Sequence, residues 1–460
     1  MSTYNDFLAS KRRVAVDVGH DVDPEAVHPS LFPFQRTIVT WALRKGRAAI
    51  FADTGLGKTR MQVEWARLTG QRTLILSPLA VTHQTVAEAE ALGVDVAYAR
   101  HQGEAEGQIT ITNYERLDRF DPAEFGAVVL DESSILKAFS GTTKKALVTA
   151  FKATPYRLCC TATPAPNDIE ELCNHADFLS VMSPAEMRST FFIADDRGRF
   201  MKYRLKGHAR TAFFRWLSSW AVACRRPSDL GFDDDGFDLP PLEVVPHVVD
   251  TGWTPGDRLF AIELRGITEQ SAARRDTLEA RVRRAVELVA EDNPDERWLI
   301  WCGRNDEADA LMKALPNAVE VRGSDPADVK AARLLDFAQG NTQIVVTKPG
   351  IAGWGLNFQR CARIVFCGLS YSYEEYYQAV RRCWRYGQTR PVLAHVVVSD
   401  AERSVWEAIE EKERQAVALS GGLAAEVSAH NRAELFAGTS AGDCYEPSSP
   451  IAIPDWLVTA

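Results

Sequence analysis

The chain has 460 residues, a hydrophobic fraction of 46% and a formal net charge of −9 at pH 7. This length predicts two or more domains, and the composition is that of a soluble globular protein. The polar N-terminus, the absence of a long apolar run and the scattered cysteines argue against a secretory signal, a membrane span, a zinc site and a disulfide framework, so we expect a cytoplasmic protein.

Residues 1–27 show weak periodicity and are interpreted as an N-terminal extension. From 28 to 240, short apolar runs alternate with helical patterns, which predicts a parallel sheet covered by helices. The runs are Ala48–Phe51, Thr73–Leu76, Gln108–Ile111, Ala127–Leu130 and Tyr156–Cys160. Residues 185–240 break this alternation, and we interpret them as a basic and aromatic insertion in the first lobe.

The alternation resumes in residues 241–419 and predicts a second parallel α/β lobe. Its apolar runs are Trp298–Trp301, Ala318–Val321, Gln343–Val346, Arg363–Phe366 and Val392–Val398. A helix is expected from Glu402 to about Ala418. Residues 420–460 are rich in Gly, Ser, Ala and Pro, so we expect a flexible tail, which is a candidate contact with a partner protein.

A phosphate loop is predicted where a strand-like run ends and a helical pattern begins, at Ala52-Asp-Thr-Gly-Leu-Gly-Lys-Thr59. Gly55 and Gly57 let backbone N–H groups turn inward, Lys58 adds positive charge, and Thr59 can hold Mg²⁺. We therefore assign nucleotide binding to Thr54, Gly55, Leu56, Gly57, Lys58 and Thr59. The alternative is an ordinary turn before a helix.

Two further motifs suit the hydrolysis of a nucleoside triphosphate. Asp131 and Glu132 follow an apolar run, where Asp131 can hold Mg²⁺ and Glu132 can polarise the attacking water. Arg382 and Arg385 share a helix face and suit the charge of a γ-phosphoryl group in its transition state. The alternatives are an acidic turn and an exposed basic helix.

An acidic protein must bind nucleic acid through a local basic surface. Two stretches are candidates, Arg197–Arg210 and Arg274–Arg284. In the first we assign nucleic-acid binding to Lys202, Arg204 and Lys206. A solvated loop or helix face is the alternative for both stretches.

Together these motifs resemble the helicase superfamily two core, specifically its Swi/Snf branch of DNA-dependent ATPases, from about Phe32 to Glu413. The resemblance implies two tandem RecA-like lobes with a nucleotide cleft between them, and ATP and Mg²⁺ as cofactors. Leu31-Phe-Pro-Phe-Gln-Arg36 resembles the segment whose glutamine reads adenine, which implies that Gln35 lies near the base. The chain looks like a compact prokaryotic or viral form.

Other segments resemble further motifs of the family. Leu74-Ile-Leu-Ser-Pro78 with Gln84, and Ile111-Thr-Asn-Tyr-Glu115, resemble motifs Ia and Ib, which implies nucleic-acid contacts at Pro78, Gln84 and Thr112. Gly353-Trp-Gly-Leu-Asn357 and the stretch from Gln378 to Gln388 resemble motifs V and VI, which implies nucleotide contacts at Gly355 and Gln388. Two departures are Ser134, where the acidic motif usually has a histidine, and Lys348-Pro349, where motif V usually has Ser-Thr.

The resulting prediction is an ATP-dependent DNA translocase, a helicase-like motor that tracks along DNA with weak sequence preference and makes no membrane contact. One alternative is a strand-separating or RNA-directed helicase. Another is an ATPase subunit or clamp of a restriction, repair or replication complex.

Overall fold

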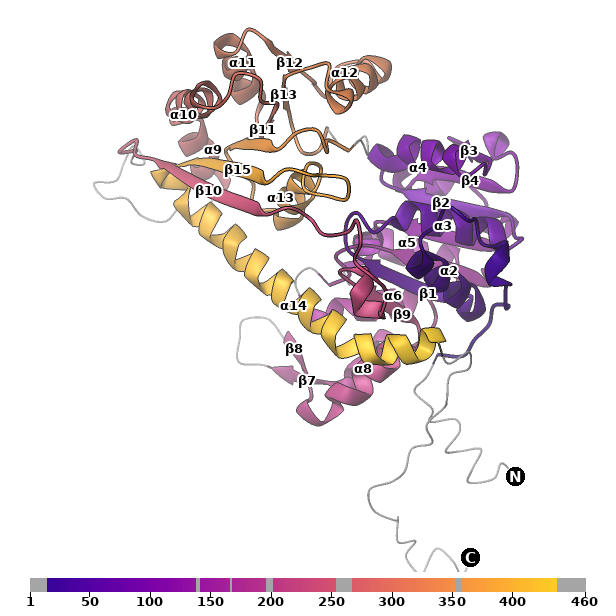
Figure 1. The fold of residues 1–460 in the computed structure, drawn as a ribbon. Helices are drawn as coiled ribbons and strands as arrows, with labels where there is room; N and C mark the ends of the chain where they lie inside the picture. Colours follow the sequence, from indigo (N-terminus) through magenta and orange to yellow (C-terminus); the bar gives the residue numbers. More distant parts are fainter. Residues whose placement is uncertain are drawn as a thin grey trace, which may run out of the picture.

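The computed structural model of the protein describes residues 15–137, 141–165, 168–195, 202–253, 267–351 and 357–436. It contains two parallel sheets, each with hydrophobic cores on both faces, in two lobes joined by the segment before β10 and by the long helix α14 (Figure 1). The expected α/β class with two tandem lobes is therefore confirmed. In the part of the chain described, no helix combines the length and apolarity that a membrane crossing requires.

The first lobe has seven parallel strands in the order β3-β4-β2-β5-β6-β1-β9. These are β1 (Arg47–Ala52), β2 (Thr73–Ser77), β3 (Val96–Tyr98), β4 (Ile109–Asn113), β5 (Ala127–Asp131), β6 (Tyr156–Cys160) and β9 (Ala221–Cys224). Its helices are α2 (Pro33–Lys45), α3 (Lys58–Leu68), α4 (Leu79–Ala91), α5 (Thr142–Ala150), α6 (Leu172–Phe178), α7 (Pro184–Phe191) and α8 (Arg210–Ser218). Ala49 and Phe51 belong to one core and Ile50 to the other, because side chains alternate along a strand.

The interpretation of residues 185–240 as an insertion needs correction. Among the described residues of this range, α7 and the antiparallel hairpin of β7 (Phe192–Asp195) and β8 (Lys202–Leu205) lie outside the parallel sheet. After them, α8 buries Phe213 and Trp216 in the main core, and β9 pairs with β1 at the edge of the sheet. The four residues of β9 carry too weak a pattern to be recognised without their distant partner strand.

The second lobe has six parallel strands in the order β10-β15-β14-β11-β13-β12. These are β10 (Leu242–Val249), β11 (Trp298–Cys302), β12 (Ala318–Glu320), β13 (Ile344–Thr347), β14 (Arg363–Cys367) and β15 (Val392–Ser399). Its helices are α9 (Ile267–Asp276), α10 (Leu278–Glu291), α11 (Asn305–Ala314), α12 (Ala327–Gln339) and α13 (Tyr373–Val380). Every apolar run expected in this region is a strand.

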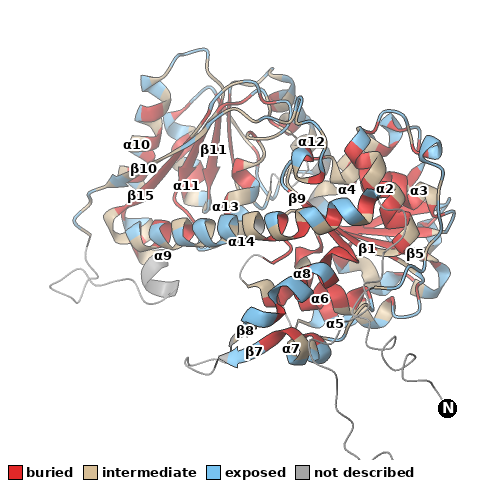
Figure 2. Ribbon diagram, turned by 60° about the horizontal axis from the view of Figure 1, so that its bottom comes forward, coloured by how far each residue is buried: buried red, intermediate tan, exposed pale blue. Residues whose placement is uncertain are grey.

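The expectation of a flexible tail from residue 420 is wrong for its first part. Helix α14 runs from Arg403 to Phe436 and carries the chain from the second lobe back across the first (Figures 1 and 2). The Asn431 side chain accepts from Ala223 N at 3.2 Å and donates to Ala221 O at 2.9 Å, so it pairs with the backbone of β9. This packing outweighs the low helix propensity of Gly421 and Gly422. The rest of the expected tail, 437–460, lies outside the described residues.

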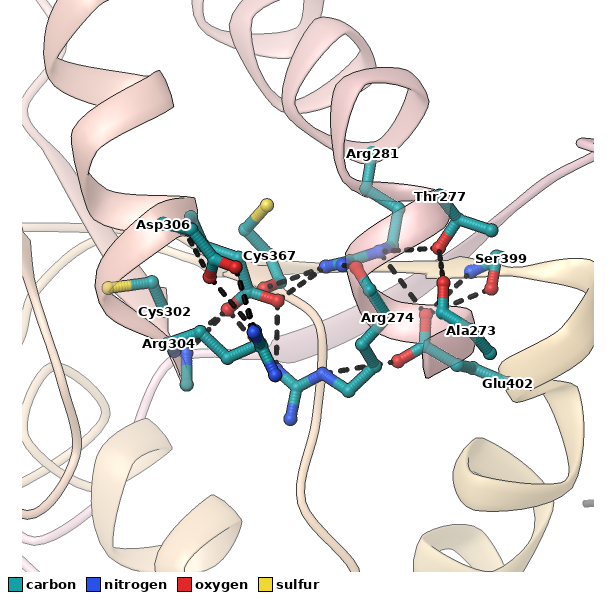
Figure 3. Close-up of polar contacts among 12 residues, drawn as sticks. Ala273, Arg274, Thr277, Arg281, Cys302, Arg304, Asp306, Cys367, Ser399 and Glu402 are labelled. Atoms are coloured by element: carbon teal, nitrogen blue, oxygen red, sulfur yellow. Dashed lines mark hydrogen bonds and ion pairs between the residues drawn. The ribbon is translucent and has the colours of Figure 1, made fainter. Parts of the chain in front are cut away.

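The start of α14 is fixed by a buried network of charges in the second lobe. Arg281 of α10 pairs with Glu307 of α11 at 2.8 Å and with Glu402, just before α14, at 3.2 Å. Arg274 of α9 contacts the same two carboxylates at 3.0 and 3.4 Å (Figure 3). The stretch Arg274–Arg284 is therefore corrected as a candidate basic surface, because two of its arginines are committed to this network.

Replacing Arg281 with Met should lower the free energy of unfolding of the second lobe by about 3–5 kcal/mol, since it removes the fully buried one of the two arginines that pair with Glu307 and Glu402. The matched control is Arg284→Met on the same helix, whose exposed pairs with Glu287 and Glu291 contribute up to about 1 kcal/mol. Urea unfolding followed by circular dichroism measures both. Equal losses for the two variants would contradict the proposed role of the network.

Candidate nucleotide site between the lobes

The segment predicted to be a phosphate loop lies between β1 and α3. Gly55 and Gly57 have φ angles of 94° and 77°, which strain any residue with a Cβ atom. A Cβ on Gly57 would lie 2.3 Å from Gln35 Nε2, and one on Gly55 would lie 3.0 Å from the backbone N of Tyr386 in the second lobe. The Lys58 ammonium donates to the carbonyls of Ala52 at 2.9 Å and Asp53 at 3.3 Å.

Gln35 holds the phosphate loop against the segment that precedes α2. Its Nε2 donates to Leu56 O at 2.9 Å, and its Oε1 accepts from Phe32 N at 3.0 Å. The side chain is 2% exposed and lines the wall of the cavity described below. Gln35 therefore has a structural role in addition to its expected place near the base.

The acidic pair lies at the carboxyl end of β5, at the centre of the sheet. Glu132 has a φ of 54°, an unusual backbone conformation for a residue other than glycine and one that is frequent at functional sites. Burial raises the pKa of Asp131, and burial raises the pKa of Glu132 to about 7 against the opposing effect of Lys58. Within the described residues, Glu132 Oε2 is buried and has no hydrogen-bond partner.

The two arginines come from the turn that follows α13 in the second lobe. Burial lowers the pKa of Arg382, whereas the nearby Glu132 carboxylate raises it. Burial and the neighbouring Arg382 lower the pKa of Arg385 to about 10. In the part of the chain described, Arg385 Nε is buried without a hydrogen-bond partner. These guanidiniums are held near each other and desolvated, as a site for a strongly anionic ligand requires.

One cavity of about 410 Å³ brings these groups together from both lobes. Its wall includes twelve of the residues that the sequence singles out: Gln35, Thr54, Gly55, Gly57, Lys58, Thr59, Pro78, Gln84, Asp131, Glu132, Arg382 and Arg385. Amide groups of the phosphate loop, two carboxylates and two guanidiniums therefore surround one space, an arrangement suited to binding and cleaving a triphosphate.

Two residues assigned to nucleotide binding lie away from the cavity wall, and a third is not described. Leu56 is 4% exposed and does not line the cavity. The assignment of Gln388 is corrected, because its side-chain amide donates to the carbonyls of Cys361 and Cys383 and accepts from the backbone N–H groups of Thr389 and Arg390. This set of bonds stabilises the turn that carries the arginines. Gly355 lies outside the described residues.

The nucleic-acid candidates do not form one surface. Pro78 and Gln84 line the cavity itself, because Pro78 precedes α4 and Gln84 lies one turn into that helix. The assignment of Thr112 is corrected, since it lies in β4 with no exposed surface. Lys202, Arg204 and Lys206 belong to or follow β8, beside α8 and away from β3 and β4 (Figure 1).

Sequence reasoning missed an aromatic part of the cavity wall. Phe32, Phe237 and Tyr386 line the cavity, and the ring centroids of Phe237 and Tyr386 lie 4.9 Å apart. Phe32 contacts both rings, at 5.0 and 6.2 Å. These residues come from three distant parts of the chain, so no local pattern signals their meeting.

The donor groups in the cavity fit a magnesium ion bound together with phosphates. Mg²⁺ prefers oxygen ligands and is usually held by one or two carboxylates plus phosphate oxygens and waters. The Thr59 hydroxyl and the Asp131 carboxylate lie on the same cavity wall. The described residues contain no cluster of three or more His, Cys, Asp or Glu that would hold a metal by itself.

Comparison with known proteins supports this interpretation of the cavity. Residues 280–387 match the family described as "Helicase conserved C-terminal domain". The chain is 22% identical over 443 residues to the "SWI/SNF-related matrix-associated actin-dependent regulator of chromatin subfamily A-like protein 1" of Xenopus laevis, covering 86% of this chain and 44% of that protein. It is 21% identical over 425 residues to the "DNA annealing helicase and endonuclease ZRANB3" of Mus musculus, covering 83% and 40%.

Among solved structures, the "Sulfolobus solfataricus SWI2/SNF2 ATPase core in complex with dsDNA" aligns with 90% of this chain and 99% of that chain, at 17% identity and a TM-score of 0.43. The chain spans less than half the length of the curated relatives it matches. The family match in the second lobe and the relatives that span both lobes agree with the motifs around the cavity. Residues 280–387 therefore match a helicase C-terminal domain, and the chain as a whole is similar to Swi/Snf-type ATPases of helicase superfamily two.

Proposed function

We propose that the chain hydrolyses ATP in the cavity between its lobes and uses the resulting opening and closing to move along DNA. The observation that supports this most directly is that the phosphate loop and acidic pair of one lobe face the two arginines of the other across a single cavity. A triphosphate bound there would contact both lobes at once, so its binding and loss would change how closely the lobes approach.

Each cavity residue has a role that its position supports. Backbone amides of the phosphate loop and Lys58 bind the phosphates, and Lys58 exchanges its loop carbonyl partners for phosphate oxygens. Thr59 and Asp131 would hold Mg²⁺, which supplies charge neutralisation at the phosphates. Glu132 accepts a proton from the attacking water, and Arg382 and Arg385 stabilise the charge of the transferred group.

DNA as the track is supported by the relatives, whose printed names refer to chromatin regulation and to DNA annealing. The net charge of −9 requires that DNA be held by local positive groups, mainly through its phosphates. Phosphate contacts carry no base information, so we propose weak sequence preference.

Replacing Lys58 with Ala should abolish ATP turnover and weaken nucleotide binding, because both the phosphate charge partner and the loop contacts are lost.

Arg385→Ala should lower kcat by about 10³-fold or more while leaving ATP affinity within a few fold, since this arginine acts mainly on the transition state. Steady-state kinetics and titration with a fluorescent ATP analogue measure these effects. Arg119→Ala, at an exposed position outside the cavity, is the control. Normal turnover by Arg385→Ala would contradict a catalytic cavity between the lobes.

The pH dependence of turnover should report Glu132. Its pKa is raised to about 7, and it must be deprotonated to accept a proton, so kcat/KM should fall about tenfold per pH unit below 7 and level off above it. Initial rates from pH 5.5 to 8.5 test this. Glu132→Gln should bind ATP, turn over slowly and lack the acidic limb. If Glu132→Gln keeps the fall of kcat/KM at acidic pH, that fall is caused by another titratable group.

DNA dependence is tested by ATP turnover with single-stranded, duplex and forked DNA and with RNA, where we expect the largest stimulation by DNA. Replacing Lys202, Arg204 and Lys206 with Gln should weaken DNA binding and flatten its salt dependence by about 0.9 log unit per log unit of salt for each lost phosphate contact. Fluorescence anisotropy at several salt concentrations measures the slope. An unchanged slope would assign these residues to a solvated hairpin.

A further inference from the structure

The carboxylate of Asp53 in the phosphate loop points to the second lobe and not into the nucleotide cavity. Asp53 Oδ1 accepts from the Tyr377 hydroxyl at 2.6 Å, and Oδ2 pairs with the Arg381 guanidinium at 3.1 Å. The Asp53 and Arg381 side chains are only 17% and 11% exposed, so water screens this pair weakly. Asp53 is absent from the wall of the nucleotide cavity and lines a smaller cavity together with Tyr377 and Arg381.

Arg381 is held in place by the rings beside it. Its guanidinium carbon lies 4.3 Å from the Trp384 ring centroid and 5.1 Å from that of Tyr377, both within the range of cation–π attraction. Trp384 Nε1 in turn donates to Pro240 O at 2.6 Å, in the segment that connects the lobes. The turn after α13 is therefore tied to the phosphate loop at Arg381 and to the connecting segment at Trp384.

Arg382 and Arg385 lie in this same turn. Arg382 directly follows Arg381, and Arg385 directly follows Trp384, so each of these two arginines is next to a residue that is fixed by an interlobe or connecting-segment contact. A shift of Arg381 away from Asp53 would move both guanidiniums relative to the phosphate loop.

The other end of α13 also contacts the first lobe. Glu374 accepts from the Ser134 hydroxyl at 3.1 Å and forms an ion pair with Lys137. Ser134 stands where the related acidic motif usually has a histidine, and Lys137 follows in the same short segment after Glu132. Helix α13 is thus attached at its start to the segment after the acidic pair and at its end to the phosphate loop.

We propose that Asp53 is a positioning residue, which docks the turn after α13 on the phosphate loop and so places Arg382 and Arg385 for ATP hydrolysis. This inference rests on the proposed function. Asp53 is not on the wall of the nucleotide cavity, so its replacement should affect the alignment of the arginines and leave nucleotide binding by the loop intact.

The first test compares kcat with KM for ATP. Asp53→Asn and Arg381→Gln should each lower kcat about ten- to a hundredfold, because misplaced catalytic groups reduce turnover. Asp53→Asn should change KM for ATP less than threefold, whereas Arg381 also lines the nucleotide cavity, so the KM comparison is made on Asp53. Arg381→Lys keeps the ion pair and should recover most of kcat. The matched control is Asp118→Asn, an exposed aspartate in the first lobe, which should behave as wild type.

The second test measures the docking of the lobes without any turnover. The eight described cysteines are buried, so spin labels can be placed at Glu90→Cys on α4 and Lys313→Cys on α11, with Cys444→Ser. Double electron–electron resonance of the nucleotide-free protein should give a narrow distance distribution for wild type. Asp53→Asn should broaden it, and the charge-exchanged pair Asp53→Lys with Arg381→Glu should narrow it again.

The outcomes separate this inference from the proposed function. If the wild-type protein hydrolyses ATP, and Asp53→Asn shows the same kcat and the same distance distribution as wild type, the role of Asp53 is overturned. The proposed function is then left intact. If KM for ATP in Asp53→Asn rises by the same factor by which kcat/KM falls, the positioning role is also overturned, because Asp53 would then serve nucleotide binding. Absence of ATP turnover in the wild-type chain, with or without DNA, would overturn both.

Discussion

The site depends on one interaction, the attraction between buried carboxylates of the first lobe and buried guanidiniums of the second lobe. Burial raises the pKa of Asp131 and Glu132 and lowers that of Arg382 and Arg385, so each group by itself resists ionisation where it lies. Lys58 and Arg382 favour the charged form of Glu132 from opposite lobes. Ionised groups on each wall therefore need partners on the other wall, which links the chemistry of the cavity to the approach of the lobes.

Helix α14 limits how the lobes can separate. Its start is held in the second lobe by the contacts of Glu402 with Arg274 and Arg281, and its end is held on the first lobe by Asn431 on β9 and by an ion pair of Glu434 with Lys45 at 3.0 Å (Figures 1 and 3). The middle of the helix lines the smaller cavity beside Asp53 and Arg381. Movement of one lobe must therefore be accommodated by α14 and by the contacts of α13 together.

The match of residues 280–387 to a helicase C-terminal domain agrees with the arginine wall of the cavity, and polar contacts of this chain connect that wall to the acidic pair. Ser134, two residues after Glu132, donates to Glu374 on the other lobe. The acidic segment is thereby connected to α13, the helix that ends in the turn of Arg382 and Arg385. The acidic pair and the arginine turn are thus connected through polar contacts of α13 at both of its ends.

The sequence by itself determined the glycine turn after β1 and the apolar runs of both sheets, and it predicted the acidic pair and the arginine pair, because each depends on neighbours in the chain. Gly55 and Gly57 permit their turn locally, and a run such as Ala127–Leu130 is apolar because parallel strands are covered on both faces. Only the tertiary structure decided that Thr112 is buried, that Gln388 stabilises a turn, that residues 420–436 are helical and that Asp53 faces Arg381. These features depend on contacts between residues far apart in the chain, and burial and pairing at such contacts outweigh local preference.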